Sequence, residues 1–181
     1  YYVGAPSGGI WKSTDSGINW TPLSDYLPQI GVSGIAIDPK NSNTIYIATG
    51  DDDAYDTYSV GVLKSTDAGI TWKKTGLDFS DTNSISNEIY IHPSNSNIIW
   101  VSTNKGFYKS IDAGANWTKK LSGNIVDFKL KPNNPNTIYC VGNGFFYKSI
   151  NGGDTFDIIS SPNLPVKGTS SRMAIDVTPA N

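Results

Sequence analysis

The chain has 181 residues, a formal net charge of −2, 17% charged residues and 12% aromatic residues. Its fourteen lysines and arginines are spread along the whole sequence, so a basic surface that binds nucleic acid is not expected. No hydrophobic run is long enough to cross a bilayer, which excludes insertion of a helix into a membrane. The single cysteine, Cys140, excludes a disulfide framework and a cysteine-ligated zinc site.

Three kinds of segment, all rich in β-branched and aromatic residues, recur in a fixed order and indicate strands. The first kind covers residues 34–39, 88–93, 126–132 and 173–177. The second kind covers residues 1–4, 44–48, 98–102 and 137–141. The third kind covers residues 9–12, 61–64, 106–109 and 144–148. Clusters of Asn, Ser and Pro separate the first kind from the second, as expected of turns, and no stretch has the periodicity of a helix.

A motif of the form Ser-x-Asp-x-Gly-x-x-Trp follows every segment of the third kind. Its copies begin at residues 13, 65, 110 and 149, so their starts are 52, 45 and 39 residues apart. Its defining residues are Ser13, Asp15, Gly17 and Trp20; Ser65, Asp67, Gly69 and Trp72; Ser110, Asp112, Gly114 and Trp117; and, in a degenerate fourth copy, Ser149, Asn151, Gly153 and Phe156. We refer to these copies as boxes 1 to 4.

The boxes are predicted to be structural turns. An Asp at the start of a tight turn accepts hydrogen bonds from backbone N–H groups, and Gly allows the positive φ that such a turn requires. A Trp at the start of the next strand buries its large ring between neighbouring sheets. We therefore expect Trp20, Trp72 and Trp117 to be largely buried.

A repeat of this length, built from short strands, is typical of a β-propeller blade. The predicted fold is all-β: about four blades of four-stranded antiparallel sheet, with a box at the turn between the third and fourth strands. The units are residues 1–32 (partial), 33–79, 86–122, 125–160 and 172–179. The last unit either begins the next blade or closes a four-bladed ring beside residues 1–4. The lack of an initiator methionine and the ends within a blade favour a piece of a larger propeller.

The boxes resemble those of the Asp-box (BNR-repeat) β-propeller superfamily, which includes sialidases, sortilin/VPS10 domains and xyloglucan-cleaving glycosidases. The segments at residues 8–15, 50–53 and 174–181 are also similar to large secreted Bacteroidetes proteins that carry sortilin-like propellers and leave the cell by type IX secretion. The resemblance implies a secreted or cell-surface protein.

The resemblance can be examined for catalytic residues. Sialidases require three arginines and a Tyr/Glu pair, whereas this chain has one arginine, Arg172, and one glutamate, Glu88. In the xyloglucan glycosidases a catalytic Asp lies just before a Gly-Gly pair. Aligning that pair with Gly8-Gly9 puts Pro6 or Ser7 at the position of the carboxylate. No catalytic residue is therefore predicted in this chain.

Two functions follow from this reading. The first is a non-catalytic binding or scaffold propeller, whose loops recognise a protein, a glycan or other domains of the same polypeptide. The alternative is a fragment of a xyloglucanase-like glycoside hydrolase with catalytic carboxylates partly outside the chain.

The stretch from Gly50 to Ser59, which we call the acidic loop, interrupts the repeat. It holds four carboxylates within six positions, which repel one another unless water or a cation neutralises them. Its candidate calcium ligands are Asp51, Asp53 and Asp56, because Ca²⁺ prefers several hard oxygens. Its candidate ligand contacts are Asp52, Tyr55 and Tyr58, because exposed aromatic rings can stack on a sugar or anchor a peptide. A solvated acidic loop without a bound ion is the alternative.

Overall fold

The computed structural model describes residues 1–27, 30–51, 57–81, 83–164 and 173–179, and none of these residues is helical. The described part therefore contains no helix that could span a membrane. Within the described residues, fifteen strands form four antiparallel sheets. Sheet 1 contains β1 (Tyr2–Ala5), β2 (Gly9–Lys12) and β3 (Thr21–Pro22). Sheet 2 contains β4 (Val32–Asp38), β5 (Asn41–Thr49), β6 (Val62–Ser65) and β7 (Lys73–Lys74). Sheet 3 contains β8 (Ser86–His92), β9 (Asn95–Thr103), β10 (Gly106–Ser110) and β11 (Thr118–Ser122). Sheet 4 contains β12 (Asp127–Lys131), β13 (Asn134–Gly142), β14 (Phe145–Ser149) and β15 (Asp157–Ile159).

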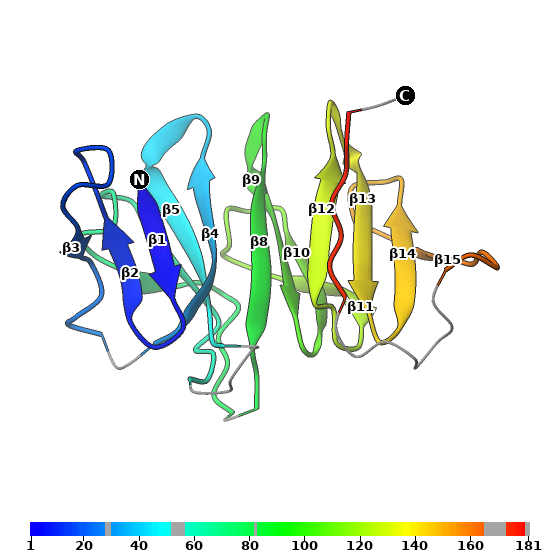
Figure 1. Cartoon of the computed structure of the whole chain (residues 1–181), viewed down its shortest axis with the longest axis horizontal. Helices are drawn as coiled ribbons and strands as arrows, with labels where there is room; N and C mark the ends of the chain where they lie inside the picture. Colours follow the sequence, from blue (N-terminus) through cyan, green and yellow to red (C-terminus); the bar gives the residue numbers. More distant parts are fainter. Residues whose placement is uncertain (28–29, 52–56, 82, 165–172, 180–181) are drawn as a thin grey trace.

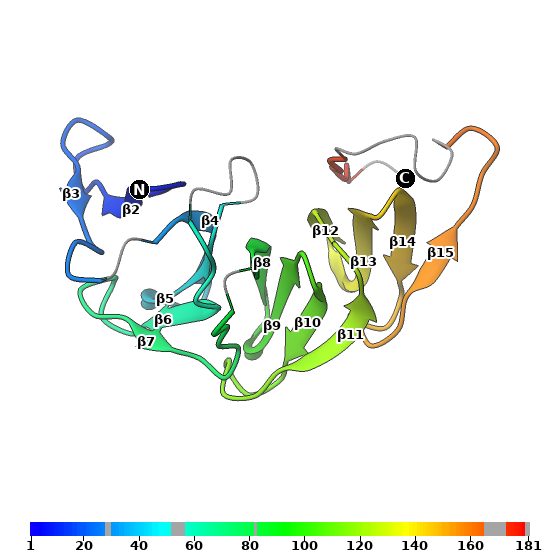
Figure 2. The ribbon, with the colours of Figure 1, turned by 90° about the horizontal axis from the view of Figure 1, so that it is seen from below.

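The sheets follow one another along an arc, with β4, β8 and β12 on its inner side and β7, β11 and β15 on its convex side (Figures 1 and 2). Within sheets 2 to 4 the strands pair in chain order, each antiparallel to the next. This architecture is a partial β-propeller, which confirms the predicted fold class. Sheet 1 has three described strands, as expected of the partial unit at residues 1–32.

The core consists of apolar layers between successive sheets, because alternate residues of a strand face opposite sides. In β5, Ile45 and Ile47 pack toward sheet 1, while Tyr46 and Ala48 pack toward sheet 3. Full burial of a large apolar side chain contributes about 1.5–3 kcal/mol. Sheets 2 and 3 thus depend for their stability on the neighbours at both of their faces.

The box tryptophans differ in burial according to what precedes them. Trp72 is 8% exposed and donates its indole N–H to the Leu23 carbonyl of sheet 1 at 3.1 Å. Trp117 is half-buried against the core between sheets 2 and 3. Trp20 is 38% exposed, so its predicted burial is wrong. Trp72 and Trp117 pack on the sheet before their own, whereas no other sheet among the described residues covers Trp20.

Residues 173–179 run extended beside β12, at the opposite end of the arc from β1 (Figure 1). The Ile175 N–H donates to Asp127 Oδ2 at 2.9 Å. The segment continues the inner series β4, β8 and β12, although it is not hydrogen-bonded as a strand.

Candidate functional site

Each box closes on itself through the same hydrogen bonds. In box 1 the Ser13 hydroxyl donates to Asp15 Oδ1 and accepts from the Gly17 N–H, both at 2.8 Å. Asp15 Oδ1 also accepts from the Asn19 N–H at 2.9 Å. Boxes 2, 3 and 4 repeat these contacts, with Asn151 Oδ1 acting for the carboxylate in box 4. The box carboxylates are therefore occupied by their own turns.

One residue of each box has a distinctive backbone conformation and, in boxes 2 to 4, links its sheet to the preceding one. It precedes the box glycine and has a positive φ: Ser16 (62°), Ala68 (61°), Ala113 (56°) and Gly152 (68°). In boxes 2 to 4 its N–H donates within its own sheet, to the carbonyls of Asn43, Asn97 and Asn136. Its carbonyl accepts from an aromatic side chain of the preceding sheet, which we call the junction hydrogen bond.

The junction hydrogen bond recurs at all three contacts between sheets. The Tyr2 hydroxyl donates to the Ala68 carbonyl at 3.2 Å, and the Tyr46 hydroxyl donates to the Ala113 carbonyl at 2.9 Å. The Trp100 indole N–H donates to the Gly152 carbonyl at 2.9 Å. Sequence reasoning missed this contact. Its signal was an aromatic residue at one position of every segment of the second kind: Tyr2, Tyr46, Trp100 and Tyr139.

Hydrogen bonds within the boxes favour the ionised carboxylates. The Asn19 backbone N–H, together with the Asn19 and Ser13 side chains, lowers the pKa of Asp15 to about 2. The Thr71 side chain and backbone N–H, with Ser65, lower the pKa of Asp67 to about 2 from an ordinary value of 3.8. Asn116 and Ser110 lower the pKa of Asp112 in the same way.

We expect these carboxylates to make the chain less stable in acid. A depressed folded-state pKa gives stabilisation that is complete above about pH 4 and is lost as the pH falls toward about 2. Asp67→Asn should flatten that dependence, because Asn151 already makes the equivalent bonds. Asn151→Asp, the reciprocal variant, should steepen it. Urea-unfolding midpoints measured from pH 5 to pH 2 are the test, and identical slopes for the two variants would refute this explanation.

The acidic loop returns to the protein beside the β1–β2 turn. Asp51 is buried, and its N–H donates to the Thr57 carbonyl at 3.1 Å. The Thr57 hydroxyl donates to the Pro6 carbonyl at 2.9 Å, and Tyr58 is 53% exposed. The other predicted loop residues lie outside the described residues: Asp52, Asp53, Tyr55 and Asp56. Within the described ranges no three His, Cys, Asp or Glu side chains gather to hold a metal ion, so the calcium hypothesis stays a prediction.

Buried hydroxyl groups anchor the end of the acidic loop. Ser59 Oγ lies 3.1 Å from Thr49 Oγ1 and 3.0 Å from Ser86 Oγ, and it accepts from the Gly61 N–H at 2.9 Å. Since all three hydroxyls are buried, their mutual hydrogen bonds avoid the cost of unpaired polar groups.

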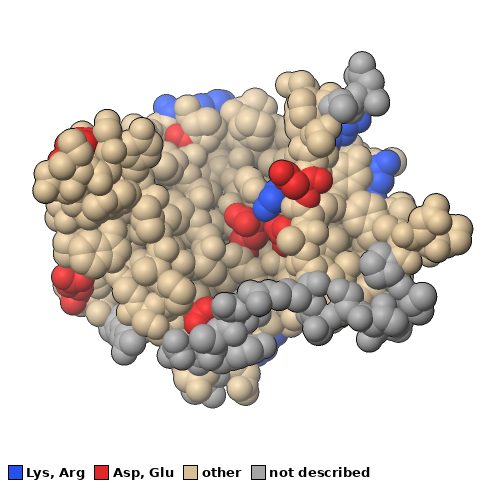
Figure 3. All heavy atoms as spheres, in the orientation of Figure 1, with Lys and Arg blue, Asp and Glu red and all other residues tan. Residues whose placement is uncertain are grey.

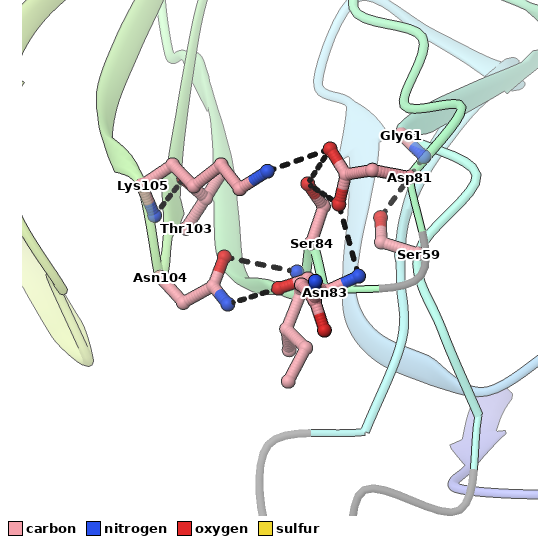
Figure 4. A network of polar contacts seen from close by, with 9 residues as sticks. Ser59, Gly61, Asp81, Asn83, Ser84, Thr103, Asn104 and Lys105 are labelled. Atoms are coloured by element: carbon pink, nitrogen blue, oxygen red, sulfur yellow. Dashed lines mark hydrogen bonds and ion pairs between the residues drawn. The ribbon is translucent and has the colours of Figure 1, made fainter.

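A second network beside it connects the loop between β7 and β8 to the β9–β10 turn (Figure 4). Asp81 binds Lys105 Nζ at 2.6 Å and accepts from the Ser84 hydroxyl at 2.9 Å. Asn104 accepts from the Ile85 N–H and donates to the Asn83 carbonyl. These contacts join the described residues of the β7–β8 loop to the β9–β10 turn.

A depression of about 370 Å³ adjoins the β1–β2 turn. Gly8, Trp11, Ser24, Asp25 and Leu27 line it, and the Trp11 indole donates to the Gly8 carbonyl at 2.8 Å. Trp11 is only half-buried and belongs to none of the core layers, in contrast to Trp100, which is 1% exposed.

A cluster of opposite charges, which sequence reasoning missed, lies over β8 and β12 on the inner side of the arc (Figure 3). Lys129 Nζ is 2.8 Å from Asp127 Oδ1, 3.4 Å from Glu88 Oε2 and 5.6 Å from the centre of the Tyr90 ring. Burial raises the pKa of Glu88, although Lys129 opposes the shift. Burial also disfavours the Lys129 ammonium, but Asp127 and Glu88 outweigh it and raise the pKa of Lys129. The cluster holds two carboxylates and one ammonium group, and the Lys129 ammonium contacts both carboxylates.

Comparison with known families and proteins gives consistent results. The Sortilin-Vps10 family model, described as "Sortilin, neurotensin receptor 3", matches residues 8–144. Xyloglucanase Xgh74A of Acetivibrio thermocellus is 33% identical over 131 residues, which cover 65% of this chain and 16% of that protein. A Paenibacillus xyloglucanase is 28% identical over 134 residues, covering 67% of this chain and 13% of that protein. The chain thus spans about one sixth or less of these relatives.

Solved structures agree with the fold. A GH74 enzyme of Niastella koreensis has a TM-score of 0.69 and 26% identity, over 90% of this chain and 28% of that one. An ancestral GH74 enzyme has a TM-score of 0.72 and 23% identity, over 90% of this chain and 22% of that one. At 23% identity, the similarity to the ancestral GH74 enzyme shows a shared fold alone.

Proposed function

Because this chain belongs to the Sortilin-Vps10 family and is similar to xyloglucanases over about two thirds of its length, we propose that it is a propeller segment of a xyloglucanase-like glycoside hydrolase. The observation that carries the proposal is the 33% identity to Xgh74A over 131 residues. Since the chain covers 16% of that relative, the rest of the polypeptide supplies most of the enzyme.

The segment contributes substrate contacts at the end of the sheets that bears the β1–β2 turn and the acidic loop. Trp11 and Asp25 both line a depression there. An aromatic ring next to a carboxylate suits a sugar, because the ring packs on the apolar face of a pyranose while the carboxylate accepts from its hydroxyls. Tyr58, exposed at the end of the acidic loop, extends the same surface in this proposal.

The chemistry itself requires a second set of residues. Hydrolysis of a glycosidic bond uses two carboxyl groups on either side of the bond, one of them held protonated. Pro6 and Ser7 stand where the resemblance would have a catalytic Asp. Asp15, Asp67 and Asp112 are bonded within their boxes. We therefore expect the catalytic carboxylates to lie partly outside this chain.

The lack of a carboxylate at Pro6 and Ser7 favours a second candidate function, a non-catalytic propeller that binds a glycan or a protein. The two candidates make different predictions for the intact polypeptide.

We expect the intact polypeptide to hydrolyse xyloglucan and the 181-residue chain alone to bind it without turnover. Reducing-end assays measure hydrolysis, and affinity electrophoresis in xyloglucan gels measures binding. Trp11→Ala should abolish the retardation of the chain in such gels, whereas Trp20→Ala, an exposed tryptophan far from the depression, should leave it unchanged. Binding without hydrolysis by the intact polypeptide would support the non-catalytic candidate. Absence of both would contradict the xyloglucanase proposal and would leave, of the second candidate, a propeller that binds a protein or another glycan.

Calcium binding by the acidic loop is a separate proposal, supported by the carboxylate density between Asp51 and Asp56. Calorimetric titration of Ca²⁺ into the chain should give heat that Asp53→Asn removes. Asp157→Asn, which takes one carboxylate from β15 instead, should not change the titration. A parent chain that gives no heat would leave the loop a solvated surface.

We further propose that the protein acts outside the cell, since xyloglucan is a polysaccharide too large to enter it. Export by a Bacteroidetes type IX secretion system is the most specific form of this proposal. Fractionation of the source cells tests it, and recovery of the protein only from the cytoplasm would contradict it.

A further inference from the structure

Tyr58 is an exposed residue between two buried ones. It is 53% exposed, whereas Thr57 is 5% exposed and Ser59 is 2% exposed. All three residues lie outside the strands, in the last part of the acidic loop before β6. A loop that only crosses from β5 to β6 could leave all of its side chains in water. Burial on both sides of one aromatic residue indicates that the backbone at this point is attached to the sheets.

Thr57 makes the attachment to sheet 1. Its hydroxyl donates to the Pro6 carbonyl in the β1–β2 turn at 2.9 Å, and its own carbonyl accepts from the Asp51 N–H. Gly31, which precedes β4, lies against this hydrogen bond. A Cβ added at Gly31 would lie 2.2 Å from the Pro6 carbonyl oxygen and 2.2 Å from Thr57 Oγ1. Glycine at this position therefore leaves room for the hydrogen bond that a larger residue would displace.

Ser59 makes the attachment to sheets 2 and 3. Its hydroxyl is hydrogen-bonded to Thr49 of β5 and to Ser86 of β8. Its N–H donates to the Ser84 carbonyl at 2.9 Å, and the next N–H, of Val60, donates to the Thr49 hydroxyl at 2.9 Å. The backbone on the two sides of Tyr58 is thus bonded to three consecutive sheets.

A ring held in this way suits a flat apolar ligand surface. A tyrosine side chain has only two main torsion angles, so a fixed backbone leaves its ring few orientations and little entropy to lose on binding. A pyranose whose hydroxyls are all equatorial, such as the glucose of a β-glucan, presents C–H groups on both faces. Such a face packs on an aromatic ring while the hydroxyls at its edge stay hydrogen-bonded.

We propose that Tyr58 is a stacking platform for a backbone glucose unit of a β-glucan, and that Thr57 and Ser59 are the positioning residues that hold it. The inference deepens the proposed function and rests on it, because the glycan is taken from the similarity to xyloglucanases. The bond from Thr57 to Pro6 ties the platform to the β1–β2 turn, which also borders the depression lined by Trp11. The two aromatic contacts therefore keep a fixed spacing along one glycan chain.

Affinity electrophoresis of the chain tests the platform, in gels that contain xyloglucan or hydroxyethyl cellulose, a β-glucan without sugar branches. Both polysaccharides should retard the unaltered chain. Tyr58→Ala should weaken binding about tenfold, Tyr58→Phe should keep most of it because the ring remains, and Trp20→Ala should leave it unchanged. Retardation that Tyr58→Ala does not alter, or no retardation by either polysaccharide, would overturn the inference.

Hydrolysis of xyloglucan by the intact polypeptide is measured separately, so the two proposals can fail independently. An active enzyme whose Tyr58→Ala variant keeps its KM would refute the platform and leave the proposed function standing. An inactive polypeptide whose chain still binds both polysaccharides through Tyr58 would do the reverse.

Variants of Thr57 distinguish positioning from a general loss of stability. Thr57→Val keeps the size of the side chain and removes the hydroxyl, so it should weaken binding severalfold, whereas Thr57→Ser should bind like the unaltered chain. Gly31→Ala should act like Thr57→Val, because it displaces the same hydrogen bond. Tyr46→Phe is the matched control, since it too removes a buried hydroxyl that donates to a carbonyl of a neighbouring sheet at 2.9 Å. It should lower the urea-unfolding midpoint without changing the binding. Equal losses of binding in Thr57→Val and Tyr46→Phe, or no restoration by Thr57→Ser, would refute the positioning role.

Discussion

Replacing Trp72 with alanine is expected to lower the free energy of unfolding by about 3–5 kcal/mol. The ring is 8% exposed and fills the layer between sheets 1 and 2, where Ile10, Ile45 and Leu63 also pack. Its removal leaves a cavity and also deprives the Leu23 carbonyl of its indole donor. Urea unfolding followed by circular dichroism measures the loss.

Trp20→Ala is the matched control, since Trp20 holds the same position in box 1. We expect it to cost less than about 1 kcal/mol, because a side chain that is already partly in water gains less from folding. Similar losses at the two positions would mean that the box rings act within their own turns rather than between sheets.

Gly61→Ala is expected to lower the free energy of unfolding by about 2–5 kcal/mol, the sum of two effects. Gly61 has a φ of +92°, which a side chain tolerates poorly, and a Cβ there would lie 1.9 Å from the Leu77 carbonyl oxygen. Its N–H donates to Ser59 at the end of the acidic loop (Figure 4). The substitution should therefore also displace that loop.

Gly17→Ala separates the two effects. Gly17 has a φ of +90°, but a Cβ would meet only the Trp20 ring, at 3.7 Å. Its cost should be the conformational part alone, about 1–2 kcal/mol. The difference between the two variants, read from thermal and urea unfolding, isolates the steric clash at Gly61. Equal costs would show that the clash relaxes freely.

The repeat predicted the fold because box spacing and segment order are local properties of the sequence. The turn between β2 and β3 could be read from Asp15 and Gly17 alone, since both act within the turn. The exposure of Trp20 could not, because it depends on whether another sheet packs against it. The burial of a box tryptophan is set by the sheet that packs against it, and the residues of the box do not specify that sheet.

The two contacts that sequence reasoning missed join residues far apart in the chain. Glu88 and Lys129 meet because β8 and β12 are adjacent inner strands. Tyr46 reaches Ala113 across a sheet junction. The aromatic repeat at Tyr2, Tyr46, Trp100 and Tyr139 was visible in the sequence, but its acceptor is a backbone carbonyl and leaves no mark on residue type. The acidic loop was predicted as an irregularity of the repeat, and the connection from β5 to β6 is longer than those from β9 to β10 and from β13 to β14. Most of its candidate ligands lie outside the described residues.

Because a main-chain carbonyl is the acceptor at each junction, the junction hydrogen bond places few limits on the evolution of the array of units. The acceptor residue is Ala68, Ala113 or Gly152, and its side chain takes no part in the bond. The donor is likewise tyrosine at two junctions and tryptophan at the third. This hydrogen bond can therefore form between any two units that keep the aromatic donor, without a matched substitution at the acceptor. Gene segments that encode one unit can be duplicated, deleted or recombined while the join between neighbours is preserved, and loops such as the acidic one can diverge independently of the joins.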